Sequence, residues 1–185
     1  LPWGIPKAVN GIMWKWILDP TAGVFTTLCK AFGFIDQNVY WFQISPIVSI
    51  TFVIIADVWK NVPFVMILLI SSLQMVPMQL YEAARCDGAS KLQQFRYITF
   101  PGIRITFLAV TMLQTISSLK VFDTLYTLTP LGGTDNMTTL TYMYSYKTSF
   151  TFLNFGYGAS IGYIVTLITL VFSIIYVRSM LKKDN

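Results

Sequence analysis

The sequence predicts an all-α membrane protein, and three observations carry that prediction. Only 11% of its 185 residues are charged, whereas a soluble domain normally carries about a quarter. Its mean hydropathy is +0.61, and Phe, Trp and Tyr make up 16% of the residues. Several mostly apolar stretches reach the roughly 20 residues that a helix needs to cross the bilayer core. The net charge of +5 is therefore better explained by orientation in a membrane than by a nucleic acid partner.

Four stretches of the chain are candidates for membrane-spanning helices. The first covers residues 1–18, and we interpret it as the remaining part of a longer span, with N-terminal spans missing from this chain. The others cover residues 46–75, 98–119 and 156–177. Between them, Asp19 to Gly23 indicates a turn, residues 24–43 have an interfacial composition, and residues 121–155 indicate a loop rich in Thr, Tyr and Gly.

The basic residues predict which ends of these spans face the cytoplasm. The loop before the third span, the start of that span and the C-terminal tail carry Arg85, Lys91, Arg96, Arg104, Arg178, Lys182 and Lys183. The loops on the opposite side carry Lys30, Lys120 and Lys147. Because basic residues gather on the cytoplasmic side, we expect a multi-pass protein of the cytoplasmic membrane with a cytoplasmic C-terminus. Cys29 and Cys86 then lie on opposite faces and cannot pair.

The polar stretch from Tyr81 to Pro101 interrupts the apolar runs, and its residues predict an ordered element rather than a flexible linker. Glu82 and the alanines after it favour a helix, and an acidic residue near its start suits the helix dipole. Gly88 permits a backbone turn or a close approach, and Pro101 suits the first turn of the next span. We therefore expect two short helices joined at Gly88, lying across the cytoplasmic mouth.

The spacing within this stretch resembles the EAA loop of ABC-importer membrane subunits. The matching positions are Glu82, Ala83, Ala84, Asp87, Gly88, Ala89, Ile98 and Pro101. Phe100 departs from the family, which usually has Leu there, and this apolar exchange changes little. The alternative is a solvated loop with incidental Ala-Ala and Asp-Gly pairs, since short motifs alone are hypotheses.

The resemblance extends over essentially the whole chain. Before the loop it rests on Leu1-Pro2, Ile5-Pro6, Trp14, Trp59 and Pro63. After the loop, the external loop of the maltose and glycerol-3-phosphate branch is similar to Phe122-Asp123, Leu128-Thr129 and Gly132-Gly133. This chain departs from the branch by one extra residue, Pro130 or Leu131, and by Thr134, where Pro is usual. This departure weakens the assignment to the branch more than the assignment to the family.

The resemblance implies a type I importer half, with residues 1–185 as a single transmembrane domain and residues 78–101 as its cytoplasmic coupling loop. In the family this loop docks on a cytoplasmic ATPase subunit, a role inherited here by Glu82, Ala83, Ala84, Asp87, Gly88, Ile98 and Pro101. The implied partners are a second permease subunit, two ATPase subunits that use ATP and Mg, an extracytoplasmic solute-binding protein and the lipid bilayer. No cofactor is expected on this chain. The implied solute is a sugar, oligosaccharide or polyol phosphate, moved by alternating access.

Polar residues inside a span predict a solute path, because polarity is expensive there. The candidates share one helical face within each span: Asp57, Asn61 and Phe64 in the second, and Gln114, Ser117 and Ser118 in the third. The resemblance implies that these positions line the sugar site. Two alternatives stay open, because Asp57 and Lys60 could neutralise each other and serines often bond a carbonyl one turn back or a neighbouring helix.

Two other functions fit parts of the sequence. Asp87-Gly88 resembles the start of the Asp-Gly motif of membrane-embedded lipid-head-group phosphotransferases, whose chemistry needs several carboxylates to hold divalent metals. The acidic residues after Gly88 lie in loops or the tail, so no carboxylate cluster is expected around Asp87. An importer of an amino acid or inorganic anion is the second alternative. The chain has no G-x-x-x-x-G-K-[ST] loop, so ATP hydrolysis is expected on separate subunits and this chain is expected not to be an enzyme.

Overall fold

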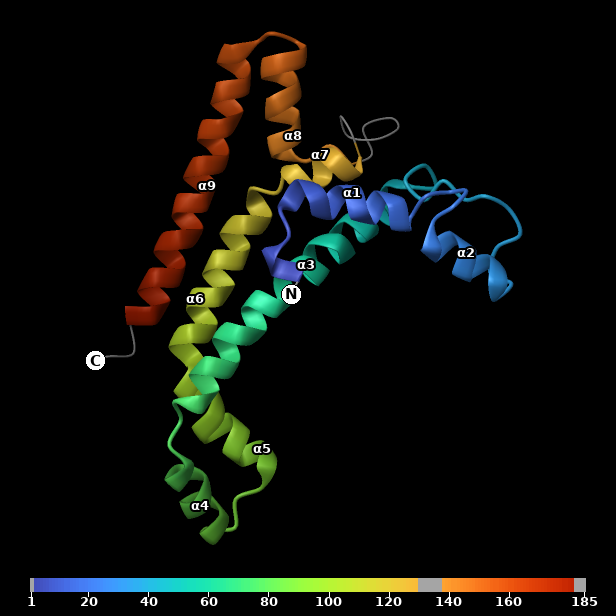
Figure 1. Ribbon diagram of the computed structural model, residues 1–185. Coiled ribbons are helices and arrows are strands. Elements are labelled where there is room, and N and C mark those ends of the chain that lie inside the picture. The colour runs from blue at the N-terminus through green and yellow to red at the C-terminus, as the bar shows by residue number, and fades with distance from the viewer. Residues whose placement is uncertain (1, 130–137, 182–185) are drawn as a thin grey trace. The chain divides into compact units, whose positions relative to one another are not determined.

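The computed structural model describes residues 2–129 and 138–181, and every regular element among them is helical (Figure 1). The α-helices are α1 (Lys7–Ile17), α2 (Val24–Ala31), α3 (Pro46–Gln74), α4 (Met78–Cys86), α5 (Lys91–Gln94), α6 (Phe100–Leu119), α7 (Asp123–Leu128), α8 (Thr141–Tyr146) and α9 (Phe155–Leu181). A 3-10 turn covers Pro2–Gly4, and π turns cover Phe95–Thr99 and Lys147–Thr151. The all-α prediction is confirmed.

Within the described residues, three helices are long and apolar enough to cross a membrane. They are α3, the continuous helix Lys91–Leu119 that joins α5, a π turn and α6, and α9 over Phe155–Met180. At 1.5 Å per residue each is about 40 Å long, which exceeds the roughly 30 Å of the hydrocarbon core. The spans expected at residues 46–75, 98–119 and 156–177 are thus confirmed. The helix that contains the expected span 98–119 begins earlier than expected, at Lys91.

Residues 1–18 contain no helix long enough to cross a membrane, so the described chain has three candidate spans where about four were expected. Its helix α1 has 11 residues and is about 16 Å long, half of what a crossing needs. The predicted turn at Asp19 follows it. The Asp19 carboxylate accepts hydrogen bonds from the amide of Ala22 and from the hydroxyl and amide of Thr21, at 2.7–2.9 Å. These donors hold the pKa of the Asp19 carboxyl below its ordinary value.

A first compact unit is formed by Leu1–Val62 with Lys120–Leu167, and α1 belongs to it. The buried core of this unit consists of Val53, Ala56, Leu125, Leu128 and Met143. The aromatic side chains of Trp14, Phe42, Phe122 and Tyr126 pack against that core. Residues from α3, α7 and α8 therefore share one apolar centre.

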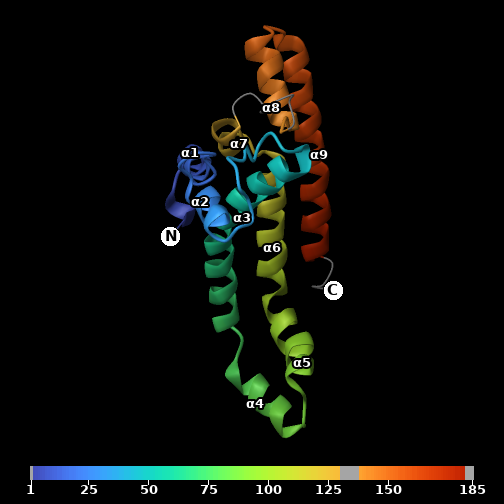
Figure 2. The ribbon, with the colours of Figure 1, turned by 90° about the vertical axis from the view of Figure 1, so that its right-hand side faces the viewer.

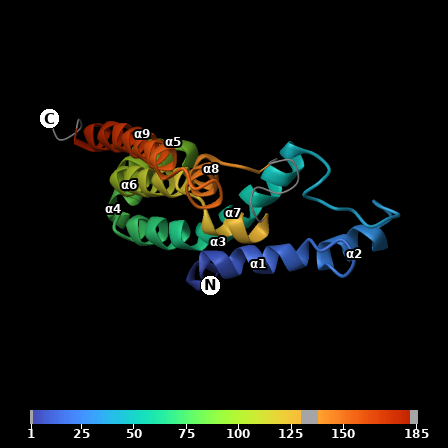
Figure 3. The same cartoon turned by 90° about the horizontal axis from the view of Figure 1, so that it is seen from above.

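Helix α1 lies against α7 within this unit (Figure 3). A Cβ atom at Gly11 would stand 2.6 Å from the carbonyl oxygen of Thr124, so the two backbones approach closely because this position lacks a side chain. The Nδ2 atom of Asn10 donates to the carbonyl oxygen of Ala56 in α3 at 3.2 Å. Helix α1 therefore packs against α7 and α3 of the same unit.

The loop expected at residues 121–155 is largely helical where the structure describes it. Helix α8 and the start of α9 run side by side as a hairpin (Figure 2). The Ser145 hydroxyl donates to the carbonyl oxygen of Gly158 at 2.8 Å, and a Cβ atom at Gly158 would collide with Ser149. Such packing stabilises a Thr- and Tyr-rich helix whose intrinsic propensity is low. The positions compared with the external loop at Pro130, Leu131, Gly132, Gly133 and Thr134 lie outside the described residues.

The second compact unit consists of Pro63–Leu119 and Ile168–Asn185. Its boundary with the first unit falls at Pro63 inside α3, where the proline ring removes a helical hydrogen bond. Ile103 and Val110 are buried, whereas many large apolar side chains of α3, α6 and α9 are exposed. Exposed apolar helices of this length are expected to face lipid.

Candidate functional site

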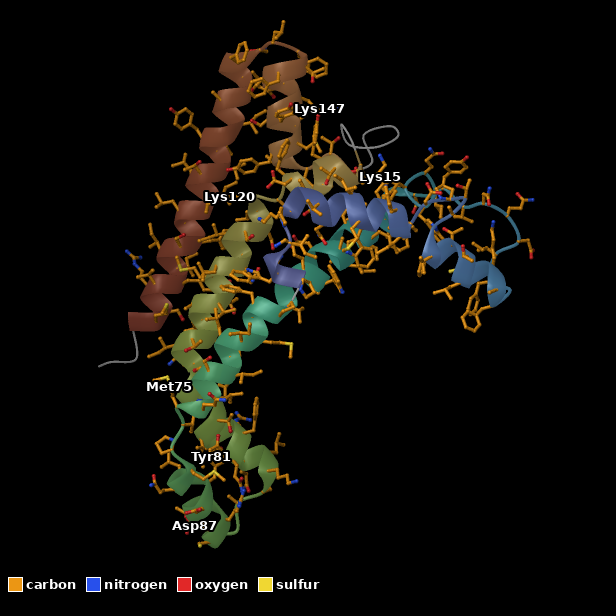
Figure 4. The ribbon with its side chains drawn as sticks, in the orientation of Figure 1. Lys15, Met75, Tyr81, Asp87, Lys120 and Lys147 are labelled. Atoms are coloured by element: carbon orange, nitrogen blue, oxygen red, sulfur yellow. The ribbon has the colours of Figure 1, made fainter. Side chains whose placement is uncertain are left out.

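The predicted coupling loop folds as two helices joined at Gly88, as expected (Figure 4). Helix α4 ends at Cys86, and Gly88 has φ +74°, in the left-handed region that glycine adopts without steric cost. The Gly88 amide donates to the carbonyl oxygen of Arg85 at 3.1 Å, and the Ala89 amide donates to that of Ala84 at 2.8 Å. These two bonds form a Schellman motif, which satisfies the last carbonyl groups of α4.

Helix α5 begins with a capping box. The Ser90 hydroxyl accepts from the Gln93 amide at 3.3 Å, while the Gln93 side-chain oxygen accepts from the Ser90 amide at 2.7 Å. The Gln94 side chain also donates to the carbonyl oxygen of Ala89 at 2.9 Å. This capping box was not predicted, although Ser-x-x-Gln before a helix is its sequence signature. The turn is therefore held from both helices.

The structure brings most of the predicted coupling residues together at this turn. The exposed ones are Glu82, Ala83, Asp87 and Gly88. Ala84 is half-buried behind them, and Asp87 lies at the far end of the loop (Figure 4). Ile98 and Pro101 lie apart from this group, at the junction with α6. The turn thus exposes most of the predicted coupling residues, whereas Ile98 and Pro101 lie where the loop joins α6.

The loop joins α6 without an interruption of the helix. Pro101 lies in the first turn of α6, as expected, but α6 follows α5 directly through the π turn Phe95–Thr99. A proline lacks an amide hydrogen and its ring crowds the carbonyl one turn earlier, which the wider π turn accommodates. A groove of about 400 Å³ beside it is lined by residues that include Val76, Leu80 and Ile98.

In α3, two of the predicted solute-path residues bond to each other. The Asn61 side chain donates to the Asp57 carboxylate at 3.0 Å. Lys60 is buried, and its ammonium group donates to the carbonyl oxygen of Trp3 at 3.2 Å. No hydrogen bond joins Asp57 to Lys60 in the described part of the chain, although the Asp57 carboxylate interacts electrostatically with the Lys60 ammonium group. Phe64 is half-buried and belongs to the other compact unit.

In α6, two of the predicted residues line a groove of about 540 Å³ within the second unit. Gln114 and Ser118 share it with Thr111, Thr115 and apolar side chains, whereas Ser117 is not part of the lining. The side-chain amide group of Gln114 has no hydrogen-bond partner among the described residues. The two threonine hydroxyls donate to the carbonyls one turn back, at 2.7 and 2.8 Å.

The two threonines of this groove were not predicted. The sequence pattern that could have identified them is the spacing of residues 111, 114, 115 and 118, which places all four on one helical face. The groove therefore combines apolar walls with one stripe of hydroxyl and amide groups. Such a surface can bind a neutral polar solute by hydrogen bonds.

A metal-dependent phosphotransferase would need a cluster of carboxylates or other metal ligands. Across residues 2–129 and 138–181, no three His, Cys, Asp or Glu side chains are placed to hold an ion together. The described structure therefore offers no support for that alternative.

Comparison with known proteins assigns the chain to a family. Residues 1–182 match the family described as binding-protein-dependent transport system inner membrane component. The trehalose/maltose transport system permease protein MalF of Thermococcus litoralis is 33% identical over 181 residues, which cover 96% of this chain and 59% of that protein. The sulfoquinovosyl glycerol transport system permease protein SmoG of Agrobacterium fabrum is 29% identical over 184 residues, which cover 100% of this chain and 58% of that protein. The chain thus spans less than two thirds of the length of these curated relatives.

Among solved structures, the chain is similar to a bacterial ABC transporter involved in the import of the acidic polysaccharide alginate. The TM-score is 0.84 at 20% identity, over 100% of this chain and 63% of that chain. A bacterial alginate ABC transporter in complex with an alginate pentasaccharide-bound periplasmic protein has a TM-score of 0.81 at 22% identity, over 95% and 60% of the two chains. These likenesses establish the fold. Since the family match covers nearly the whole sequence, the chain belongs to the inner membrane components of binding-protein-dependent transport systems.

Proposed function

We propose that the chain is a permease subunit of an ATP-driven importer that moves a sugar, oligosaccharide or polyol phosphate across the cytoplasmic membrane. The observation that carries this proposal is the rigid loop of α4, Gly88 and α5, whose exposed motif residues lie between two candidate spans. The carbohydrate class is supported by the trehalose/maltose and sulfoquinovosyl glycerol permeases among the relatives.

In this proposal a cytoplasmic ATPase subunit binds the exposed side of the turn, where Glu82 and Asp87 offer charge and Gly88 offers bare backbone. That subunit and a second ATPase subunit use ATP and Mg, and their movement is passed to this chain. The Schellman motif and the capping box support this role, because a turn held from both helices moves as one body.

The solute is proposed to pass along the stripe of Gln114 and Ser118 and along the paired side chains of Asp57 and Asn61. Amide and hydroxyl groups both donate to and accept from sugar hydroxyls. A second permease subunit would complete the path, and an extracytoplasmic solute-binding protein would deliver the solute. A periplasmic protein of this kind is bound in the solved alginate transporter complex.

The C-terminus is proposed to be cytoplasmic. With α1 counted outside the spans, Lys7 and Lys15 are assigned to the same side as the start of α3, and Lys60 lies inside α3. Seven basic residues then belong to the side of the coupling loop and five to the opposite side. When residues 1–18 are taken as a span, the numbers are seven and three. The excess is smaller, but it still favours a cytoplasmic coupling loop.

Labelling of the two cysteines tests this orientation. Cys86 is exposed in the coupling loop and Cys29 is half-buried near the end of α2. A thiol reagent that cannot cross membranes is expected to label Cys86 only after the cells are permeabilised, and to reach Cys29 from outside if it reaches either. Variants with each cysteine replaced by serine identify the labelled site. Labelling of Cys86 on intact cells would overturn the orientation.

Uptake by the assembled transporter tests the function itself. The full-length protein, purified with its co-expressed partners and reconstituted in vesicles, is expected to import a labelled carbohydrate when ATP and the binding protein are supplied. The solutes compared are trehalose, maltose, an amino acid and inorganic phosphate. Import of the amino acid or phosphate alone would overturn the carbohydrate class. Import of trehalose or maltose that continues without ATP would overturn the role in an ATP-driven importer.

A further inference from the structure

A hydrogen bond closes the coupling loop at its open end. The Tyr81 hydroxyl lies 2.9 Å from the Thr99 hydroxyl, and both residues are half-buried. Tyr81 precedes Glu82 on α4, whereas Thr99 ends the π turn that leads into α6. Figure 4 shows Tyr81 between Asp87 at the turn and Met75 just after α3. The bond therefore joins two elements that the chain connects only through the far turn.

The direction of this bond follows from a second contact of Thr99. Its hydroxyl also lies 3.4 Å from the carbonyl oxygen of Gln94, to which it must donate because a carbonyl only accepts. Tyr81 then donates to Thr99. The Gln94 side chain in turn donates to Ala89, whose amide donates to Ala84 in α4. The polar contacts thus run from α4 through the π turn and back to α4.

An apolar contact lies next to this bond. Gly102 is three residues after Thr99, so the two share a helical face. A Cβ atom at Gly102 would stand 2.8 Å from a methyl carbon of Val76, which precedes α4. The start of the loop therefore contacts the start of α6 at two neighbouring places, through Tyr81 with Thr99 and through Val76 with Gly102.

We infer that Tyr81 and Thr99 are a positioning pair whose hydrogen bond holds α4 against the start of α6. A displacement of α4 is then passed to α6 directly, instead of being absorbed at the short connection around Pro77. The π turn contributes by placing the Thr99 hydroxyl where it meets both Tyr81 and Gln94. This inference rests on the proposed function, because it describes how movement of a bound ATPase would reach a span.

The test measures the number of solute molecules imported per ATP hydrolysed by the reconstituted complex. Tyr81→Phe and Thr99→Val each remove one hydroxyl with little change in shape, and each is expected to lower this ratio by about two- to tenfold, the range set by one hydrogen bond. The double variant is expected to lose no more than the single variants, since both remove the same bond. Thr99→Ser keeps the hydroxyl and should restore the ratio.

Tyr97→Phe is the matched control, because Tyr97 belongs to the same π turn but is 72% exposed. It should leave the ratio at the wild-type value. An unchanged ratio in Tyr81→Phe, or losses that add up in the double variant, would overturn the positioning pair. A variant that does not assemble is replaced by its partner variant in the same measurement. Failure of the wild-type complex to import any carbohydrate would instead overturn the proposed function.

Discussion

Gly88→Leu is expected to lower ATP-driven uptake per assembled complex by about tenfold or more, while the spans remain inserted. Gly88 adopts φ +74°, and a leucine in the left-handed region costs about 1–2 kcal/mol. The Schellman bonds from Gly88 and Ala89 to α4 depend on that conformation. With the turn distorted, the exposed side chains at Glu82 and Asp87 no longer present one surface. Uptake and ATPase activity are measured on the same reconstituted sample.

Two further substitutions separate the backbone turn from close contact with a partner. A Cβ atom at Gly88 would meet no atom of this chain within 4 Å, so a small side chain causes no internal clash. Asn tolerates the left-handed conformation, whereas Ala does not. If the turn alone matters, Gly88→Asn keeps uptake and Gly88→Ala reduces it. If the ATPase packs on the bare backbone, Gly88→Asn also loses uptake. Wild-type uptake by Gly88→Leu would remove the coupling role from this loop.

Gln114→Ala is expected to raise the solute concentration needed for half-maximal uptake by roughly tenfold, with basal ATPase activity unchanged. The Gln114 amide lines the groove in α6 and has no partner among the described residues, so it is available to the solute. Losing one or two hydrogen bonds to the solute corresponds to about 1.4 kcal/mol, or a factor of ten. The measurement is uptake per assembled complex across a range of solute concentrations.

Gln74→Ala is the control for this change, because Gln74 is exposed at the end of α3 and is not part of the groove. It should leave the half-maximal concentration unchanged. Asn61→Ala is a less direct test, since the Asn61 side chain bonds Asp57 and its loss leaves that carboxylate without this donor. A normal half-maximal concentration in Gln114→Ala would remove this face of α6 from the solute path.

Much of the fold follows from the sequence alone, because the signals are local. The three spans are apolar for long enough that only a membrane-crossing helix satisfies their backbone groups. The turn at Gly88 is equally local, since glycine after a helix favours the left-handed conformation that ends it. The family resemblance could likewise be found from the spacing of Glu82, Gly88 and Pro101, and the family match confirms it.

Contacts between distant segments decided the rest. Residues 1–18 are apolar enough to suggest a span, but the close approach at Gly11 and the bond from Asn10 to Ala56 place α1 against protein. Hydropathy measures transfer out of water and does not distinguish lipid from a protein neighbour. The helices α7 and α8 arose in a stretch with weak helix propensity because packing stabilises them, as the contact of Ser145 with Gly158 shows. The bond between Tyr81 and Thr99 joins residues 18 positions apart, so it exists only once the loop has folded back on itself.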